Sequence, residues 1–233
     1  MKALQKWGGI AALYEAAAYI AGMVFFIGVV DSAGAVDPAQ KVALLAENQA
    51  MMHLITLIIY VIFGVFLVVL SLALHQRLRA NAPALMQAAT AFGLIWAGLV
   101  IAGGMIFIIG MNTVVEFYNQ DSAQAAMVWS AIDPVFEGLG GGVELVGGLW
   151  VLLISWAALR TGQLGRALNY LGVMVGVAGI ITILPALGEI GAMIFGLGQI
   201  VWFVWLGIVM LSTKREGVVE KIDTFASQQS SIG

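Results

Sequence analysis

The chain has 233 residues, of which 61% are hydrophobic and only 10% are charged, and its formal net charge is −3. This composition excludes an ordinary soluble domain, in which about 25% of the residues are charged. The sequence contains no cysteine, so disulfide bonds, thiolate metal ligands and cysteine catalysis are excluded as well.

Apolar runs of about 20 residues or more recur along the chain, and each is long enough to cross a hydrocarbon core of about 30 Å as a helix. The first run follows Lys2 and Lys6, but its length favours a retained span over a cleaved signal peptide. The polar residues 213–233 are predicted to form a flexible cytoplasmic tail. We predict an all-α, polytopic membrane helix bundle over residues 1–212, with six transmembrane helices at about 7–30, 50–74, 84–111, 136–159, 167–187 and 190–212.

Basic residues are concentrated on one side of the predicted spans. Only Lys41 falls in a loop on the other side, where most of the acidic residues also fall. The positive-inside rule therefore places the N and C termini in the cytoplasm. The basic residues on the predicted cytoplasmic side are Lys2, Lys6, Arg77, Arg79, Arg160, Arg166, Lys214, Arg215 and Lys221.

Two loops on the predicted outer side begin with similar helix-start patterns. Asp37 precedes Pro-Ala-Gln, and Asp121, 84 residues later, precedes Ser-Ala-Gln, so each carboxylate can cap a short helix. Sixteen residues beyond these aspartates lie His53 and Glu137. The pattern favours related hairpins in spans 1–2 and 3–4, with spans 5–6 as a third hairpin without the long loop. The alternative is an inverted three-plus-three repeat that relates spans 1 and 4.

Two glutamates lie inside predicted spans, Glu15 in span 1 and Glu144 in span 4. An acidic side chain at the bilayer centre costs about 2.5–3.5 kcal/mol on insertion scales, so it usually has a role. Small residues accompany each glutamate at helical spacing, which indicates faces in contact with protein. The helix rise separates the two carboxyls by about 10 Å in depth, so we do not expect a directly paired acid dyad.

Each glutamate has two interpretations. It is either a protonated group hydrogen-bonded to a neighbouring helix, or one step of a proton or ligand path with Glu137 and His53 at the outer step. The candidate polar site comprises Glu15, Glu144, Glu137, His53, Tyr19 and Gln199. Glycines at helical spacing are predicted to form helix-packing contacts, and they are Gly140, Gly141, Gly147, Gly148, Gly172 and Gly176.

Patterns typical of enzymes and cofactor proteins do not occur in the sequence. There is no phosphate-binding GxxxxGK[ST], no HExxH and no GxSxG motif. His53 and His75 would lie about 33 Å apart on one helix, too far to share a haem or a metal. No predicted span contains a lysine for a retinal Schiff base, and no basic, aromatic patch indicates nucleic acid. We expect no cofactor, no metal and no catalytic residues, which argues against an enzyme.

The opening residues 8–14 (GGIAALY) and the closing residues 198–207 (GQIVWFVWLG) resemble those of a known bacterial family. This family of six-span membrane proteins is named domain of unknown function 4386, and its length and hydropathy are similar as well. The resemblance implies a multi-pass protein of the bacterial inner membrane and transfers no activity, ligand or site residue.

Two functions of different class follow from these features. The first is a non-enzymatic accessory, sensory or structural membrane component whose partners are the lipid bilayer and other membrane proteins or a second copy of itself. The alternative is a small proton-coupled transporter that uses Glu144 and Glu15. A cavity that reaches Glu144 from outside favours the transporter, whereas dry, packed surroundings at both carboxyls exclude it.

Overall fold

The computed structural model describes residues 2–29, 37–141 and 144–230, and every regular element within them is helical. Five segments of this part are long and apolar enough to cross a membrane: Ala3–Gly28, Gln49–Leu78, Pro83–Tyr118, Ser122–Thr161 and Gly188–Ser212. Arg166–Ile181 is a further, shorter apolar helix. The predicted all-α, multi-pass architecture is therefore confirmed.

The helices follow one another with short connections. Three π-helical segments, named η1, η3 and η4, continue or interrupt the longer helices. In chain order the elements are α1 (Lys2–Met23), η1 (Val24–Val29), α2 (Pro38–Glu47), α3 (Gln49–Thr56), η3 (Leu57–Ile62), α4 (Phe63–Leu78), α5 (Pro83–Tyr118), α6 (Ser122–Phe136), η4 (Glu137–Gly141), α7 (Leu145–Thr161), α8 (Arg166–Ile181) and α9 (Gly188–Ser230).

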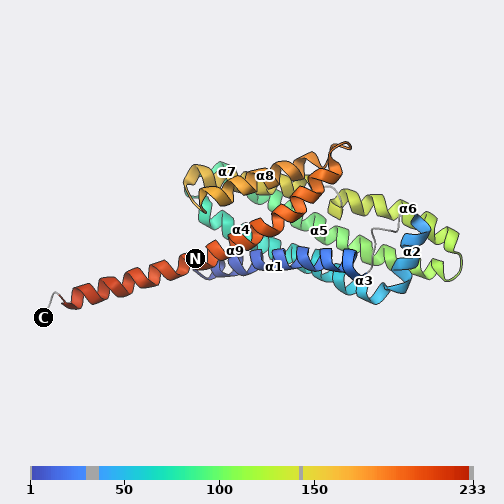
Figure 1. Cartoon of the computed structure of the whole chain (residues 1–233), viewed down its shortest axis with the longest axis horizontal. Coiled ribbons are helices and arrows are strands. Elements are labelled where there is room, and N and C mark those ends of the chain that lie inside the picture. The colour runs from blue at the N-terminus through green and yellow to red at the C-terminus, as the bar shows by residue number, and fades with distance from the viewer. Residues whose placement is uncertain (1, 30–36, 142–143, 231–233) are drawn as a thin grey trace.

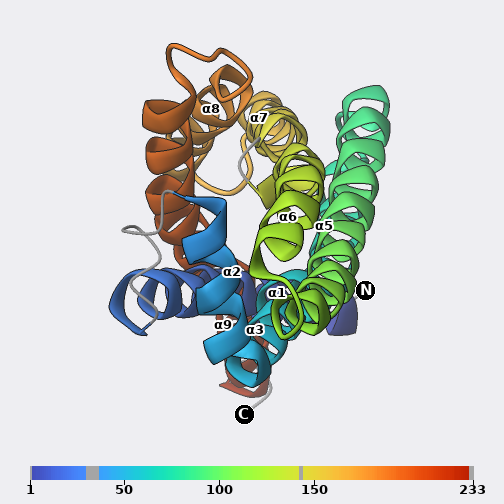
Figure 2. The same cartoon turned by 90° about the vertical axis from the view of Figure 1, so that its right-hand side faces the viewer.

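The long helices form three antiparallel hairpins arranged in a ring (Figure 1 and, viewed from one end, Figure 2). The hairpins are α1 with α4, α5 with α7, and α8 with α9. Each also packs against the next, because α4 contacts α5 and α7 contacts α8, and α9 closes the ring against α1.

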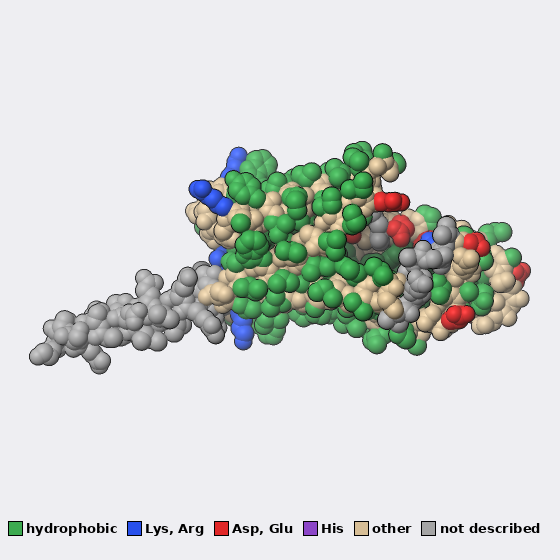
Figure 3. Space-filling view, viewed as in Figure 1, with side chains coloured by type: hydrophobic (Ala, Val, Ile, Leu, Met, Phe, Trp, Pro, Cys, Tyr) green, Lys and Arg blue, Asp and Glu red, His purple; other side chains and the backbone are tan. Residues whose placement is uncertain are grey.

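Charged side chains separate along the length of this bundle. Basic side chains lie at the end that holds the N-terminus, and acidic ones at the other, as Figure 3 shows for one face. We call these the basic end and the acidic end. Helix α9 continues past the basic end to Ser230 (Figure 1). The domain boundary at residue 212 and the flexible tail stay predictions.

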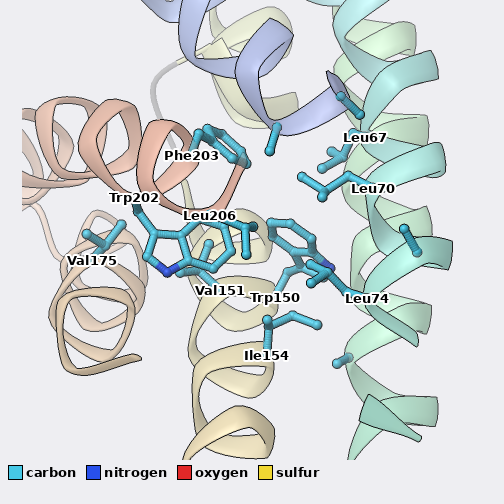
Figure 4. Close-up of a cluster of buried hydrophobic side chains, with 14 of the residues drawn as sticks. Leu67, Leu70, Leu74, Trp150, Val151, Ile154, Val175, Trp202, Phe203 and Leu206 are labelled. Atoms are coloured by element: carbon cyan, nitrogen blue, oxygen red, sulfur yellow. The ribbon is translucent and has the colours of Figure 1, made fainter. Parts of the chain in front are cut away.

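All six long helices contribute to the core of the ring, and large apolar side chains of α4, α7 and α9 meet at its centre (Figure 4). Leu67 and Leu70 of α4 lie there with Trp150 of α7 and with Phe203 and Leu206 of α9. Trp150 and Phe203 have ring centroids 6.4 Å apart. The three hairpins therefore share one apolar centre.

Buried positions repeat from hairpin to hairpin. Residues 67, 70 and 74 of α4 match residues 151, 154 and 158 of α7 at the 84-residue offset of the two loop aspartates, and all six have an exposed fraction of 0%. Ser71 and Ser155 are related by the same offset. The buried faces of α4 and α7 therefore have the same register.

One close contact is repeated as well. A Cβ added to Gly93 of α5 would touch Ser71 Oγ and lie 2.5 Å from Trp150 Nε1. A Cβ added to Gly172 of α8 would touch Ser155 Oγ and lie 2.6 Å from Nε1 of the tryptophan at 202. The same serine–glycine–tryptophan contact thus joins α4, α5 and α7, and then α7, α8 and α9, which supports related hairpins over the inverted repeat.

A second layer covers the acidic end of the first two hairpins. Helices α2 and α6 pack on each other and on the end of α5 around a separate apolar cluster that includes Val42, Met111 and Trp129. Asp37 and Asp121 cap these helices as predicted, by accepting hydrogen bonds from Ala39 N at 3.4 Å and Ala123 N at 3.0 Å. Between α8 and α9 only residues 182–187 form the connection, so the third hairpin has no such layer.

The largest departure from the predicted elements lies in span 4. The sequence predicts a continuous helix at about 136–159, but α6 ends at Phe136 and α7 begins at Leu145. Gly140 has a φ of 123°, which glycine adopts without steric cost, and a Cβ there would meet no atom within 4 Å. Gly140 therefore interrupts the helix and does not pack against another one.

Candidate functional site

A cavity of about 490 Å³ lies between the hairpins, in the half of the bundle nearer the acidic end. Segments α1–η1, η3–α4, α5, η4–α7 and α9 all contribute to its wall. Most of the lining is apolar. The side chains with polar atoms are Tyr19, Tyr60, Trp96 and Glu144.

The lining of the cavity reaches the surface of the bundle at exposed residues of α1–η1 and of α9. These helices approach closely toward the basic end, where a Cβ added to Gly207 would lie 3.0 Å from the carbonyl oxygen of Gly9. Nearer the acidic end, residues of both helices line the cavity. Some of these side chains are also exposed at the surface: the exposed fraction is 37% for Met23 and 65% for Ile27. Figure 3 shows a hollow on this face beside acidic side chains. We call this part of the lining, with Met23, Ile27, Met193 and Leu197, the mouth of the cavity, and its exposed side chains are apolar.

Glu144 is held at the cavity by its backbone. Its N–H donates to Thr182 Oγ1 at 2.9 Å, and the Thr182 hydroxyl donates to the Gly179 carbonyl at 2.7 Å. A Cβ added to Gly148 would lie only 2.7 Å from the Gly176 carbonyl oxygen, so α7 and α8 touch backbone to backbone just beyond this point. The start of α7, with Glu144 as its N-cap residue, is thereby fixed to the end of α8.

The Glu144 carboxylate does not cap its own helix, and it has no hydrogen bond or ion pair within the described part of the chain. Glu144 lines the same cavity as the phenol groups of Tyr19 and Tyr60. The polar end of the cavity therefore holds an ionisable carboxyl group and two phenol groups.

Aromatic rings form the wall next to these groups. Phe63 lies 5.7 Å from the Tyr19 ring and 5.9 Å from the Trp96 ring, centroid to centroid. Behind them, the rings of Phe203 and Trp150 belong to the packed core. The packed core therefore lies between the cavity and the basic end.

Glu15 lies outside the cavity, one helical turn before Tyr19. Its exposed fraction is 0%, and neither carboxyl oxygen has a hydrogen-bond partner among the described residues. The amide of Gln199 in α9 is equally buried and equally without a partner there. The two predicted glutamates therefore lie in different surroundings, one at a cavity and one in packed protein.

The other predicted residues differ in whether they line the cavity. Tyr19 lines the cavity, whereas His53 and Glu137 are exposed and do not line it. Among the glycines, Gly140 lines the cavity and Gly141 ends η4. Cβ atoms at the remaining four would come within 2.7 Å or less of atoms of neighbouring helices, and these four are Gly147, Gly148, Gly172 and Gly176.

Most of the lining residues were not among the predicted site residues, and the aromatic ones among them include Tyr60, Phe63 and Trp96. The hairpin repeat contains a signal for the first of them. Tyr60 lies 84 residues before Glu144, which is the offset between the first and second hairpins. Gly196 of α9 lies 52 residues after Glu144. The same offset of 52 residues relates Trp150 of the second hairpin to the tryptophan at 202 in the third. Positions 60, 144 and 196 all line the cavity, so it lies where equivalent positions of the three hairpins meet.

A comparison with protein families gives one match, and it covers most of the chain. The family model described as "Domain of unknown function (DUF4386)" matches residues 9–209. This range contains every segment that lines the cavity. No curated protein and no solved structure matches the chain. The chain therefore belongs to the DUF4386 family of proteins.

Proposed function

We propose that this protein is a non-enzymatic, sensory or accessory component of the bacterial inner membrane that binds an apolar small molecule taken up from the bilayer. The observation that carries this proposal is the laterally open cavity. Its volume of about 490 Å³ falls in the usual range for small-molecule sites, about 300–1,000 Å³. Its walls are mostly apolar and it has few polar groups, as is typical of such sites.

The proposal includes six spans with both termini in the cytoplasm. Helix α8 has 16 residues, or about 24 Å at 1.5 Å per residue, close to the thickness of a hydrocarbon core. It packs along α7 and α9, which belong to candidate spans, so it lies within the same layer of the bundle. The charge separation between the two ends supports a cytoplasmic basic end.

Binding without transport is the simpler interpretation because packed core lies between the cavity and the basic end. Leu67, Leu70 and Leu206 are fully buried in the core between the cavity and the basic end. A ligand can enter and leave through the lateral mouth without any rearrangement of these side chains, whereas transport requires the core to open.

Labelling inside the cavity tests the proposal. Phe63 and Trp96 have exposed fractions of 4% and 3%, so a membrane-soluble reagent reaches them only through the cavity. We expect a neutral dodecyl-chain diazirine alcohol, photolysed with the full chain in lipid nanodiscs, to label peptides that contain these two residues. Labelling confined to residues exposed on the lipid-facing surface would contradict the proposal.

A matched pair of variants controls the experiment. A Cβ at Gly196, which lines the cavity, and a Cβ at Gly98, which is exposed and does not, would each meet no atom within 4 Å. Gly196→Trp should fill the cavity and abolish labelling at Phe63 and Trp96. Gly98→Trp adds the same side chain outside the cavity and should leave this labelling unchanged.

A proton-coupled carrier is the second candidate, and two observations favour it: the cavity reaches Glu144, and span 4 is interrupted. Carriers place binding sites at broken helices, and partnerless polar groups inside a bundle mark proton paths in pumps and transporters. Glu144 lies at such a break, and Glu15 and Gln199 lie between it and the basic end. In proteoliposomes with a pH gradient, Glu15→Gln and Glu144→Gln should each stop ligand-coupled proton uptake at normal folded yield. Absence of such uptake in the unmodified protein would reject the carrier.

A further inference from the structure

We propose that the cavity selects a lipophilic organic cation, an amine or quaternary ammonium group attached to a hydrocarbon chain. The ammonium lies between Glu144 and the faces of the aromatic rings, and the chain extends toward the lateral mouth. This inference rests on the proposed function, because it names the ligand class of the same cavity.

The first argument is charge. No basic side chain lines the cavity in the described part of the chain, and segments 30–36 and 142–143, which lie outside that part, contain no lysine or arginine in the sequence. Lys41 of α2 is paired with Asp133 at 2.7 Å. Glu144 is half-buried at the cavity, and a carboxylate that loses hydration there gains from a cationic or hydrogen-bonding partner. Glu144 therefore lacks a counter-charge that a bound cation would supply.

The second argument is the nature of the surrounding rings. Tyr19, Tyr60 and Trp96 line the same cavity as the carboxylate. Aromatic faces attract ammonium groups within about 6 Å, and sites for quaternary ammonium ligands are built from several such rings. A carboxylate together with three electron-rich rings is more selective for a cation than an apolar wall would be.

The third argument is the shape of the rest of the cavity. From the polar end to the mouth the lining is apolar, and it ends at the exposed side chains of Met23, Ile27, Met193 and Leu197. A hydrocarbon chain can lie along this wall and continue into lipid without leaving an apolar environment. The cavity thus matches an amphiphile with a cationic head and one chain.

Equilibrium dialysis of the full-length protein in phosphatidylcholine nanodiscs tests the inference, with empty nanodiscs subtracted. The probes share a dodecyl chain: dodecyltrimethylammonium is cationic, dodecanol is neutral, and dodecylphosphocholine carries the zwitterionic headgroup of a lipid. We expect saturable binding of the cation, at least tenfold tighter than that of either other probe. Equal binding of cation and dodecanol would overturn the inference, and so would equal binding of dodecylphosphocholine, which would assign the site to a lipid headgroup.

Variants identify the carboxylate. Glu144→Gln should weaken cation binding at least tenfold and leave dodecanol binding unchanged, which also shows that the variant is folded. Glu144→Asp retains the charge and should retain the preference for the cation. Glu116→Gln removes one negative charge at an exposed position of α5 outside the cavity and should change nothing. A cation preference that survives Glu144→Gln would overturn the inference.

The outcomes also separate this inference from the proposed function. If dodecanol binds as tightly as the cation and Gly196→Trp abolishes both, the cavity binds apolar molecules without selecting charge. If no probe binds saturably and Phe63 and Trp96 stay unlabelled, the proposed function fails together with the ligand class.

Discussion

The contact between α7 and α8 should be the most sensitive point of the fold to a single added methyl group. A Cβ at Gly148 would lie 2.7 Å from Gly176 O, 2.7 Å from Ile180 N and 2.8 Å from Gly179 C. All three are backbone atoms, so no side-chain rotation can relieve the clash. Since non-bonded heavy atoms prefer about 3.5 Å or more, Gly148→Ala must separate the two helices by roughly 0.8 Å.

The cost follows from the contacts that this separation weakens. A gap of about 0.5–1 Å forfeits a quarter to a half of each dispersion contact across the interface, and overpacking of one methyl group costs about 1–3 kcal/mol. Replacement of glycine by alanine within a helix by itself raises the free energy of unfolding by about 0.5–1 kcal/mol, because alanine has the higher helix propensity. We therefore expect Gly148→Ala to lower the free energy of unfolding by about 1–2 kcal/mol.

Gly98→Ala is the matched control, because its Cβ would meet nothing within 4 Å and only the helix-propensity gain remains. The two variants should differ by about 1.5–3 kcal/mol in denaturant titrations of the protein in nanodiscs, followed by tryptophan fluorescence. Equal stabilities would refute the backbone contact between α7 and α8. Ligand binding should fall only in Gly148→Ala, because the Gly148 N–H donates to the Glu144 carbonyl at 2.8 Å.

Further predictions concern hydrogen bonds that hold the cavity and the second layer. Thr182→Val removes the acceptor of the Glu144 N–H, so it should cost about 1–3 kcal/mol of stability in denaturant titrations and weaken cation binding, whereas Thr113→Val, which loses only an exposed bond within α5, should do neither. Asp121→Ala should destabilise α6 by about 1 kcal/mol in hydrogen exchange, because this carboxylate caps two backbone N–H groups, at 3.0 and 3.1 Å. Asp37→Ala should have a smaller effect on α2, since its single capping bond is 3.4 Å long, and equal effects would contradict the ranking.

The succession of helices could be predicted from hydropathy, and the short helices of the second layer from their capping residues. The interruption of span 4 could not, because glycines at helical spacing are typical both of a close helix contact and of a break. Gly148 and Gly140 illustrate the two cases within one span. Nor could the end of α8 at Ile181 be predicted, because the turn that follows it, residues 182–187, is as apolar as the helix itself.

The candidate site was predictable where polarity marks it. Glu144 and Tyr19 line the cavity, and their polar atoms inside predicted spans were the reason to select them. Trp96 and Phe63 were missed, because aromatic residues in an apolar span are as common in packing as in binding. Glu15 was also selected for its polarity, and its sequence context resembles that of Glu144. The structure buries Glu15 completely, so polarity within a span did not distinguish a cavity residue from a packed one.

The asymmetry of the three hairpins explains where the cavity opens. At the equivalent positions the first hairpin has an aromatic ring in Tyr60, the second a carboxylate in Glu144, and the third only the hydrogen of Gly196. The third hairpin also lacks the layer that α2 and α6 form over the other two. The position without a side chain and the uncovered end thus belong to the same hairpin, beside the mouth between α1 and α9. The three hairpins are therefore similar in arrangement but not in side chains. The cavity reaches the surface beside the third hairpin because Gly196 leaves space where Tyr60 and Glu144 place side chains.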